Sequence, residues 1–469
     1  MITFILNQKL INTERAPGTT LIDFIRYEMD LPGTKIGCRE GDCGACTVLE
    51  GKLKGKKVTY KSIVSCLTPL GNVHGKHIVT IEGINQKHIS PVQESLVKHS
   101  GTQCGFCTPG FVMSLTAHSL SETTSDCQKI KSSLSGNICR CTGYKSIERA
   151  ASDISELLKH KDMKDPIRWL IKENFLPDYF LEIPLQLANI KKIKTRSKDS
   201  KIKMGGGTDL MVRTPEVIEE SGLDFCLGKK ELKGITSDHK SCYIGASTTA
   251  GEIMNSPIIR KIIPEITNYF KLVSSEPIRN MGTVAGNIIN ASPIGDLSIL
   301  LLALNADVHL ADISLNRIVP LNKFFLGYKQ LEIKKEEHIV KISFPIPEKP
   351  FLTNFEKVSK RIHLDIASVN SAIKLEMNEN IITEISISYG GISPIPLYLK
   401  ITSDFLKGKN ITPDNIINAN TYLQEEISPI SDVRGTVEYK RLLARQLLFA
   451  HFIKLFPAKI TSNELVNKI

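Results

Sequence analysis

The feature that most constrains this chain is the cysteine spacing near its N-terminus. The segment "GCREGDCGACTV" contains Cys38, Cys43 and Cys46 as C-x4-C-x2-C, and Cys66 follows in "YKSIVSCLTPL". The first three cysteines have the spacing of plant-type [2Fe–2S] sites. The glycines between them allow the loop to take unusual dihedrals and to direct backbone N–H groups at sulfur. Cys66 ends a β-branched stretch, so the sequence predicts that a strand end supplies the fourth ligand.

A second group of four cysteines lies between residues 104 and 141. Cys104 and Cys107 form C-x2-C in "QCGFCTPG", and Cys139 and Cys141 form C-x-C in "NICRCTGY". Thr108 before Pro109, and Thr142 before an apolar helical pattern, are predicted N-caps. Both cysteine pairs would then precede helix N-termini, which favour an anionic cluster. The sequence therefore predicts a second [2Fe–2S] centre.

Zinc is the alternative ligand for such cysteine sets. Structural zinc usually takes two C-x2–4-C knuckles, whereas the first group here supplies three ligands from one loop, and C-x-C is awkward for a knuckle. Iron–sulfur is therefore the favoured interpretation, and a zinc-stabilised binding module is the rival from another class. Cys127, Cys226 and Cys242 fit neither group and are predicted to be small core residues or bystanders.

Composition restricts the partners. The 469 residues have a formal net charge of +11 but only 6% aromatic residues, and no basic arm stands out, so no nucleic-acid partner is expected. No apolar run reaches membrane-spanning length, so no membrane contact is expected. The stretch "MITFILNQKLINTE" is predicted to be a first strand rather than a signal peptide, and the chain is expected in the cytoplasm.

Two glycine-rich signatures lie in the middle of the chain. In "KIKMGGGTDLMV" a short strand is predicted to enter three successive glycines, where backbone N–H groups can approach a phosphate closely. The second, "IRNMGTVAGNIINASPIGDLSILLLAL", offers polar donors in a compact loop before a strongly apolar segment. Neither is the G-x-G-x-x-G fingerprint, so a Rossmann fold is not indicated, and an ordinary tight turn remains the simpler alternative.

Together, "CREGDCGACTV", "QCGFCTPG", "NICRCTGY", "GGGTDL" and "GTVAGNIINASPIGD" resemble the molybdenum hydroxylases, the family of xanthine dehydrogenase and aldehyde oxidase. The resemblance implies an α+β multidomain chain. Its expected parts are a β-grasp [2Fe–2S] ferredoxin domain at 1–84, an all-α [2Fe–2S] helical domain at 85–160, a linker at 161–175, an α+β FAD-binding domain at 176–346 and an α/β CO dehydrogenase flavoprotein-like C-terminal domain at 347–469.

The same resemblance implies the residues of an FAD site. Residues 203–210 and 283–287 would wrap the pyrophosphate and nearby atoms, Asp296 would hold a ribityl or adenosine hydroxyl, Ile339 would pack on the flavin, and Lys357 would contact it. Val273 stands where some members have an aromatic ring. The full set is Lys203, Met204, Gly205, Gly206, Gly207, Thr208, Asp209, Leu210, Thr283, Val284, Ala285, Gly286, Asn287, Asp296, Ile339 and Lys357.

By resemblance, the chain is the iron–sulfur/flavin subunit of a xanthine dehydrogenase, an oxidoreductase of purine catabolism. A separate large molybdopterin-binding subunit would oxidise hypoxanthine or xanthine, and electrons would pass through two clusters to FAD and then NAD+. No catalytic acid or base is assigned to this chain. A dimer of heterodimers is expected. The alternatives are the same subunit of an enzyme for aldehydes, nicotinate or another heterocycle, and O2 as the acceptor.

Overall fold

The computed structural model describes residues 1–121, 126–191, 202–312, 316–361 and 364–466. The chain divides into two compact units: residues 1–228 with 275–282, and residues 229–274 with 283–469. The predicted FAD-binding domain, residues 176–346, is divided between these units. Its residues 176–228 and 275–282 belong to the first unit, and the rest belong to the second. No helix among the described residues is long and apolar enough to span a membrane.

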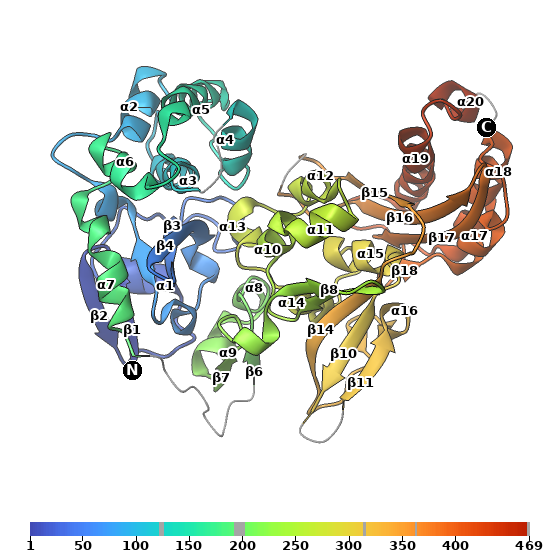
Figure 1. Cartoon of the computed structure of the whole chain (residues 1–469), viewed down its shortest axis with the longest axis horizontal. Coiled ribbons are helices and arrows are strands. Elements are labelled where there is room, and N and C mark those ends of the chain that lie inside the picture. The colour runs from blue at the N-terminus through green and yellow to red at the C-terminus, as the bar shows by residue number, and fades with distance from the viewer. Residues whose placement is uncertain (122–125, 192–201, 313–315, 362–363, 467–469) are drawn as a thin grey trace. The chain divides into compact units, whose positions relative to one another are not determined.

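The first unit begins with a five-stranded sheet (Figure 1). Its strand order is β2-β1-β5-β3-β4, with β1 and β5 parallel and the other neighbours antiparallel. The short helix α1 (Leu21–Asp23) contributes apolar residues to the core beside the sheet. This is the expected β-grasp domain, and the predicted first strand is confirmed. The strands are β1 (Ile2–Leu6), β2 (Lys9–Thr13), β3 (Thr47–Lys54), β4 (Lys57–Val64) and β5 (His77–Val79).

A helical domain follows, as expected. Its four helices bury their apolar faces in one core, and a capping box between Ser90 and Gln93 begins the first of them. The apolar face predicted for the last helix is confirmed, because Ile147, Ala150 and Ile154 are buried. The helices are α2 (Pro91–Lys98), α3 (Thr108–Ser119), α4 (Cys127–Ser133) and α5 (Lys145–Leu157).

The two predicted threonine caps are wrong. Thr108 is the first residue of α3, whose N-cap is Cys107, and its hydroxyl bonds the Thr102 hydroxyl instead. The last helix, α5, begins three residues beyond Thr142, because Gly143 and Tyr144 both take positive φ (63° and 68°) and turn the chain first. The Thr142 side chain is thereby left beside the cysteines.

The segment 161–175, predicted as a linker, is folded into the first unit. Asp165 caps helix α6 (Pro166–Lys172), and Leu170 and Phe175 are buried in the core of the helical domain. The remaining elements of this unit are α7 (Ile183–Ala188), β6 (Ile202–Met204), α8 (Leu210–Arg213), α9 (Pro215–Glu220), β7 (Leu223–Phe225) and α13 (Glu276–Arg279). Strand β6, which pairs in parallel with β7, leads the chain into the glycine-rich loop.

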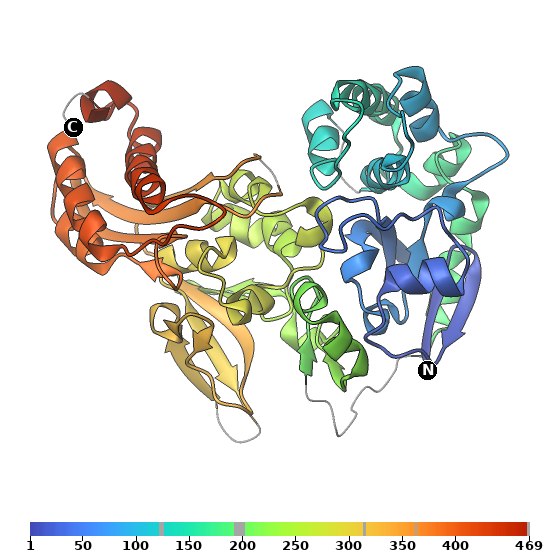
Figure 2. The ribbon, with the colours of Figure 1, turned by 180° about the vertical axis from the view of Figure 1, so that it is seen from behind.

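The second unit contains two antiparallel sheets (Figures 1 and 2). The first has strand order β11-β10-β14-β9-β8. Its strands are β8 (Ile235–Ser237), β9 (Ser241–Gly245), β10 (Asp307–Ala311), β11 (Asn316–Pro320) and β14 (His338–Pro345), and a small hairpin joins β12 (Phe325–Gly327) to β13 (Gln330–Leu331). The accompanying helices are α10 (Ala250–Asn255), α11 (Pro257–Ile262), α12 (Ile266–Lys271), α14 (Val284–Asn290), α15 (Asp296–Ala303) and α16 (Leu321–Phe324).

The second sheet, β15-β16-β17-β18, is backed by helices, as the C-terminal resemblance implies. Alternation along β17 explains its two faces: Ile385, Ile387 and Tyr389 enter the core shared with the C-terminal helices, whereas Ser388 donates to the backbone of α15. The elements are β15 (Phe351–Val358), β16 (Val369–Asn378), β17 (Ile381–Gly390), β18 (Leu397–Tyr398), α17 (Lys400–Leu406), α18 (Pro413–Glu426), α19 (Val437–Leu455) and α20 (Ser462–Val466).

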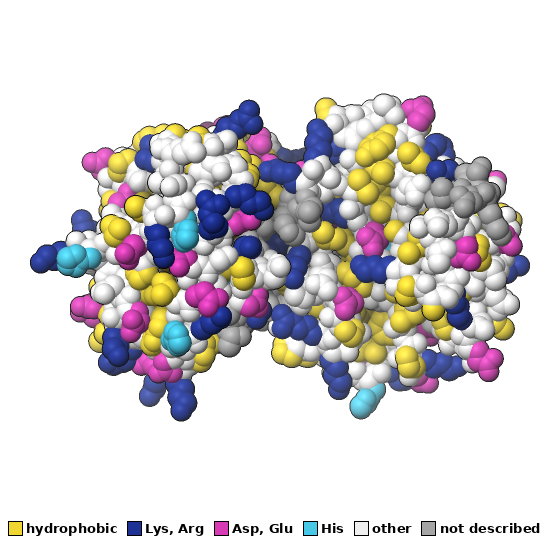
Figure 3. Space-filling model, turned by 90° about the horizontal axis from the view of Figure 1, so that it is seen from above, with side chains coloured by type: hydrophobic (Ala, Val, Ile, Leu, Met, Phe, Trp, Pro, Cys, Tyr) yellow, Lys and Arg dark blue, Asp and Glu magenta, His cyan; other side chains and the backbone are white. Residues whose placement is uncertain are grey.

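The surface charge is mixed. On the face drawn in Figure 3, lysine and arginine side chains are interspersed with aspartate and glutamate, and the described residues form no continuous basic stripe there. On this face the positive charges are therefore not gathered in one patch.

Candidate iron–sulfur and flavin sites

The four cysteines of the first group lie together as two pairs. Cys46 Sγ is 3.3 Å from Cys66 Sγ, which lies in the short 3-10 turn directly after β4. Cys38 Sγ accepts the backbone N–H groups of Glu40 at 3.3 Å and Cys43 at 3.4 Å. The loop therefore directs backbone donors at sulfur, as its glycines predict.

A hydrogen bond joins the two sulfurs of each pair. The hydrogen bond from Cys43 lowers the pKa of Cys38 to about 4, and the one from Cys66 lowers the pKa of Cys46. The pKa values of Cys43 and Cys66 are raised by the same bonds. Thiolates are the metal-binding form of cysteine, so each pair contains one sulfur that is readily ionised. A Cβ at Gly37 would lie 2.7 Å from Cys43 Sγ, so the close approach there requires glycine.

The second group also forms two pairs. Hydrogen bonding joins Cys107 to Cys139 and Cys104 to Cys141. Burial, followed by the bond to Cys139, raises the pKa of Cys107 to about 12. Burial raises the pKa of Cys139, but donors including the Thr142 hydroxyl at 3.1 Å and its N–H at 3.4 Å outweigh burial and lower it. Cys104 and Cys141 are exposed, so this site reaches the surface of the unit.

Pairing of the sulfurs is compatible with a two-iron site. Among the described residues, no three Cys, His, Asp or Glu side chains are arranged around one metal-ion position. A [2Fe–2S] centre has two irons that share four thiolates, whereas structural zinc gathers all four on one ion. Two pairs per site therefore fit the two-iron centre. Outside both sites, Cys226 and Cys242 are buried and Cys127 is exposed beside Ser152 at 3.1 Å.

The loop "GGGTDL" lies in the first unit, between β6 and α8. Gly207 has φ of +89°, and a Cβ on Gly206 would meet the Met281 carbonyl oxygen at 2.0 Å. The Gly205 carbonyl accepts from Asn72 at 2.8 Å. The glycines thus serve a close backbone packing as well as the predicted approach to a phosphate. Thr208 follows them, half-buried at the loop's end.

The second glycine-rich loop, residues 283–287, lies in the second unit and begins α14. Thr283 caps this helix by accepting the Gly286 N–H at 3.1 Å, and the Ala285 N–H donates to Ala246 O at 3.1 Å. Asn287 Oδ1 accepts both the N–H (3.1 Å) and the hydroxyl (3.0 Å) of Ser298. The Thr283 hydroxyl hydrogen and the Asn287 amide are therefore the groups these side chains could offer a ligand.

Asp296 and Lys357 form a buried ion pair in the second unit. Lys357 Nζ is 2.7 Å from Asp296 Oδ2 and donates to Leu272 O at 2.8 Å, one residue before Val273. The Lys357 and Asp296 side chains are 2% and 13% exposed. The structure thus brings together two of the predicted flavin-contacting residues. Ile339 lies buried on β14, opposite Leu310 of β10.

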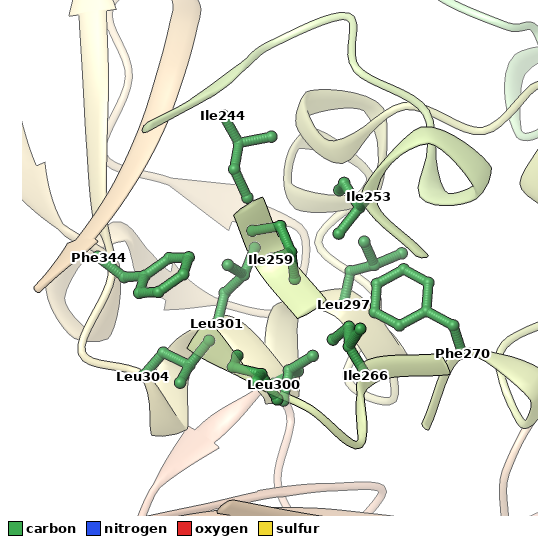
Figure 4. A pocket seen from close by; sticks show the side chains of 11 residues that line it. Ile244, Ile253, Ile259, Ile266, Phe270, Leu297, Leu300, Leu301, Leu304 and Phe344 are labelled. Atoms are coloured by element: carbon green, nitrogen blue, oxygen red, sulfur yellow. The ribbon is translucent and has the colours of Figure 1, made fainter. Parts of the chain in front are cut away.

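A cavity of about 20 Å³ in the second unit is not a candidate site (Figure 4). The figure shows isoleucine, leucine and phenylalanine side chains from α10, α11, α12, α15, β9 and β14 pointing toward one another around it. A binding site needs polar groups that orient its ligand, and this lining offers none. The cavity is therefore a packing space of the core.

Four family models match the chain in order. They are the 2Fe-2S iron-sulfur cluster binding domain at 4–70, the [2Fe-2S] binding domain at 80–152, the FAD binding domain in molybdopterin dehydrogenase at 178–347 and the CO dehydrogenase flavoprotein C-terminal domain at 355–455. Each cysteine group falls within an iron–sulfur model, and both glycine-rich loops fall within the FAD model.

Similar proteins include xanthine dehydrogenase of Oryza sativa subsp. japonica, 30% identical over 92% of this chain, and aldehyde oxidase 3 of Rattus norvegicus, 27% identical over 97%. The chain spans only 38% and 39% of those proteins. A solved carbon monoxide dehydrogenase from Hydrogenophaga pseudoflava matches at 25% identity and TM-score 0.50, over 53% of this chain and 87% of that one. Quinoline 2-oxidoreductase from Pseudomonas putida 86, 23% identical with TM-score 0.51 over 55% of this chain and 90% of that one, shares the fold.

Fold, cysteine pairing and domain models together define an iron–sulfur flavoprotein that binds two [2Fe–2S] clusters and FAD. The chain belongs to the molybdenum hydroxylases, since its four domains are those of that family. Sequence reasoning missed two side chains near these sites. Thr142 was interpreted only as a helix cap although it directly follows "CRC", whereas Asn370, which contacts Asp296, lies in an unremarkable strand pattern.

Proposed function

We propose that this chain is the iron–sulfur/flavin subunit of a xanthine dehydrogenase. A molybdopterin-containing partner chain would oxidise hypoxanthine or xanthine, and this chain would deliver the electrons to NAD+. The observation that carries the proposal is the presence of two four-thiol sites and two flavin-type loops, in that order, on one chain. The match to the rice xanthine dehydrogenase over 92% of the chain supports the purine assignment.

When bound, the clusters supply single-electron transfer, and FAD supplies the exchange between single electrons and hydride. The chain's own residues hold and tune these groups. Eight thiolates bind iron, the N–H groups of Glu40 and Cys43 stabilise charge on Cys38, and Thr142 does the same for Cys139. Residues 203–210 of the first unit would contribute to FAD binding, and residues 283–287, Asp296, Ile339 and Lys357 of the second unit would do the same. No proton transfer by a side chain is required for this task.

The exposed end of the second cysteine site is the proposed entry point for electrons. Gln103, Cys104 and Cys141 are exposed, and Phe106 beside them is 47% exposed. A partner protein bound at this metal-ligand pair would cover the Phe106 side chain. We assign this surface to the molybdopterin-binding subunit, in a dimer of heterodimers.

The acceptor loop, residues 359–367, is the proposed determinant of NAD+ use; residues 362 and 363 lie outside the described part. Arg361 bonds Asp365 through its backbone N–H at 2.9 Å and its Nε at 2.7 Å, so its charge is offset. Exposed Lys360 therefore supplies the attraction for the phosphates of NAD+.

The test combines composition and turnover. The purified chain should be brown and contain about four iron atoms, as two [2Fe–2S] clusters require, and one FAD. Assembled with its molybdopterin partner, it should oxidise xanthine faster than aldehydes, nicotinate or quinoline, and reduce NAD+ faster than O2. Stoichiometric zinc would refute the cofactor assignment, a faster aldehyde or heterocycle reaction would refute the purine assignment, and faster O2 reduction would refute the acceptor.

A further inference from the structure

Asn370 of β16 holds the carboxylate that we assign to flavin binding. This side chain is completely buried, and its Nδ2 lies 2.5 Å from Asp296 Oδ1 and 3.2 Å from Ile294 O. The other carboxylate oxygen, Asp296 Oδ2, is bonded to Lys357 Nζ at 2.7 Å. Because different side chains hold the two oxygens, the plane of the carboxylate is fixed.

The orientation of the Asn370 amide is determined by its surroundings. Rotating it by 180° would place Oδ1 against two acceptors, Asp296 Oδ1 and Ile294 O, so only the observed orientation satisfies both. In the described part of the chain, Asn370 Oδ1 is buried without a hydrogen-bond partner. A buried oxygen without a hydrogen-bond partner destabilises the folded state. The folded structure nevertheless keeps both amide hydrogens bonded to Ile294 O and Asp296 Oδ1, in the segment where α15 begins.

The neighbouring strand β17 leaves room for the contact between Asn370 and Asp296. Gly390 of β17 is the register partner of Asn370, and a Cβ there would lie 2.2 Å from Asn370 Oδ1 and 2.9 Å from Pro293 O. Gly391 has φ of +86° and donates its N–H to Pro293 O at 3.1 Å. The two glycines therefore let residues 293–296 approach the ends of β16 and β17 closely enough for Asn370 to reach Asp296.

We propose that Asn370 is a positioning residue for FAD, which orients the Asp296 carboxylate toward a flavin hydroxyl and keeps Lys357 beside it. A carboxylate has about four lone-pair sites, so two bonds from Lys357 and Asn370 leave acceptor capacity for a ligand hydroxyl. The inference rests on the proposed FAD site. It assigns no contact between Asn370 and FAD; its effect passes through Asp296.

The test is a double-mutant cycle on the FAD dissociation constant, measured by flavin fluorescence with the full-length chain after removal of FAD. Asn370→Ala should weaken FAD binding about tenfold, the loss of one hydrogen bond to a charged group. In an Asp296→Ala background, the same substitution should have almost no further effect, because the group it positions is gone. Asn378→Ala, on the exposed end of β16, is the matched control and should leave FAD binding unchanged.

Two further measurements separate the possible failures. Iron content and the EPR signals of both clusters should be unaffected in Asn370→Ala, and its flavin reduction potential should shift together with that of Asp296→Ala. Wild-type FAD affinity in Asn370→Ala, or full additivity in the double variant, would overturn the positioning role. Absence of FAD and clusters from the wild-type chain would instead overturn the proposed function.

Discussion

At the residue scale, the cysteine motifs supply donors as well as ligands. The C-x4-C loop contributes N–H groups to Cys38, and the residue after C-x-C contributes a hydroxyl to Cys139. Hydrogen bonds to ligand sulfurs are among the factors that set cluster potentials. The two sites are therefore expected to differ in potential, since backbone donors act at one and a side-chain hydroxyl also acts at the other.

Cys43→Ser should remove or alter only the first cluster, and Cys139→Ser only the second, because each thiol pairs within its own group. EPR spectra of the reduced chain should lose one centre in each variant, and iron content should fall by about half when two equal clusters become one. Cys127→Ser is the control and should retain both signals. Loss of both centres in either single variant would contradict two independent sites.

Thr208→Val should weaken FAD binding about tenfold while both clusters remain, since it removes one hydroxyl donor at nearly constant volume. This change is cleaner than Gly206→Val, whose added side chain would collide with the Met281 backbone whatever its effect on phosphate. Fluorescence titration with FAD measures the loss, and Thr208→Ser should restore most of the affinity. Unchanged binding in Thr208→Val would remove this hydroxyl from the flavin site.

At the residue scale, contacts between residues close in the sequence were easier to predict than contacts between distant residues. Cysteine spacing is a local signal, and it predicted the two groups that the structure brings together. The Asn370–Asp296 contact joins positions 74 residues apart, and the Gly206–Met281 approach joins two distant segments. Neither follows from a local pattern, because strand pairing and loop packing decide which distant residues meet.

At the element scale, the ferredoxin sheet contains a buried charge cluster. Glu50 of β3 lies opposite Lys61 of β4, and 3.4 Å separates the Glu50 carboxylate from Lys61 Nζ. The Glu50 carboxylate is also 2.7 Å from Nζ of Lys76, which directly precedes β5. Lys61 Nζ also donates to Asn280 O, and the Asn280 amide donates to Ser62 O at 2.9 Å. The cluster thus anchors the segment after α13 to the edge strand β4.

Glu50→Gln should destabilise this sheet by about 3 kcal/mol at pH 7, since it leaves Lys76 buried without its counter-charge. Burial raises the pKa of Glu50, but Lys61 and Lys76 outweigh burial and lower it to about 2 from its ordinary 4.5. A depressed carboxyl pKa stabilises the fold above pH 4.5 and loses this contribution as pH falls toward 2. The difference between wild type and variant should therefore narrow with acidification.

Thermal unfolding of the full chain between pH 7 and pH 3 measures this effect. Glu94→Gln, on the exposed side of α2, is the control and should follow the wild-type curve. Equal melting temperatures for Glu50→Gln and wild type at pH 7 would show that the cluster contributes nothing to stability.

Helix and strand identities were more predictable than their ends. The β-branched run before Cys66 was read correctly as a strand, because burial dictates its pattern. The apolar helical face was read correctly at Ile147, Ala150 and Ile154, whereas the predicted Leu157 is 45% exposed. Both threonine caps were wrong, since Gly143 and Tyr144 turn the chain before α5 begins, and Thr108 instead pairs with Thr102. The charged segment 161–175 proved helical, because Leu170 and Phe175 have a core to enter that its composition does not reveal.

At the scale of the whole molecule, the family matches divide the chain into two iron–sulfur domains and a two-part flavoprotein, whereas the relatives are far longer. Under the proposed function, electron entry and electron exit are separate properties of the chain. Entry depends on the exposed end of the second cysteine site, and exit depends on the flavin loops. A change at one end should therefore leave the half-reaction at the other end intact.

The chain by itself should oxidise NADH with an artificial dye, because that half-reaction needs only FAD and the clusters, and should not hydroxylate hypoxanthine or xanthine. Co-expression with a molybdopterin-binding subunit should restore hydroxylation, with the two chains purifying in equal amounts.

In that complex, Gln103→Ala should slow purine-dependent NAD+ reduction severalfold, since exposed Gln103 adjoins Cys104 at the proposed entry surface. NADH-dependent dye reduction should stay near the wild-type rate. Gln186→Ala, at a half-buried position on α7, is the matched control for both rates. Equal losses of both rates in Gln103→Ala would place its effect on the fold, and purine hydroxylation by the isolated chain would overturn the division of labour.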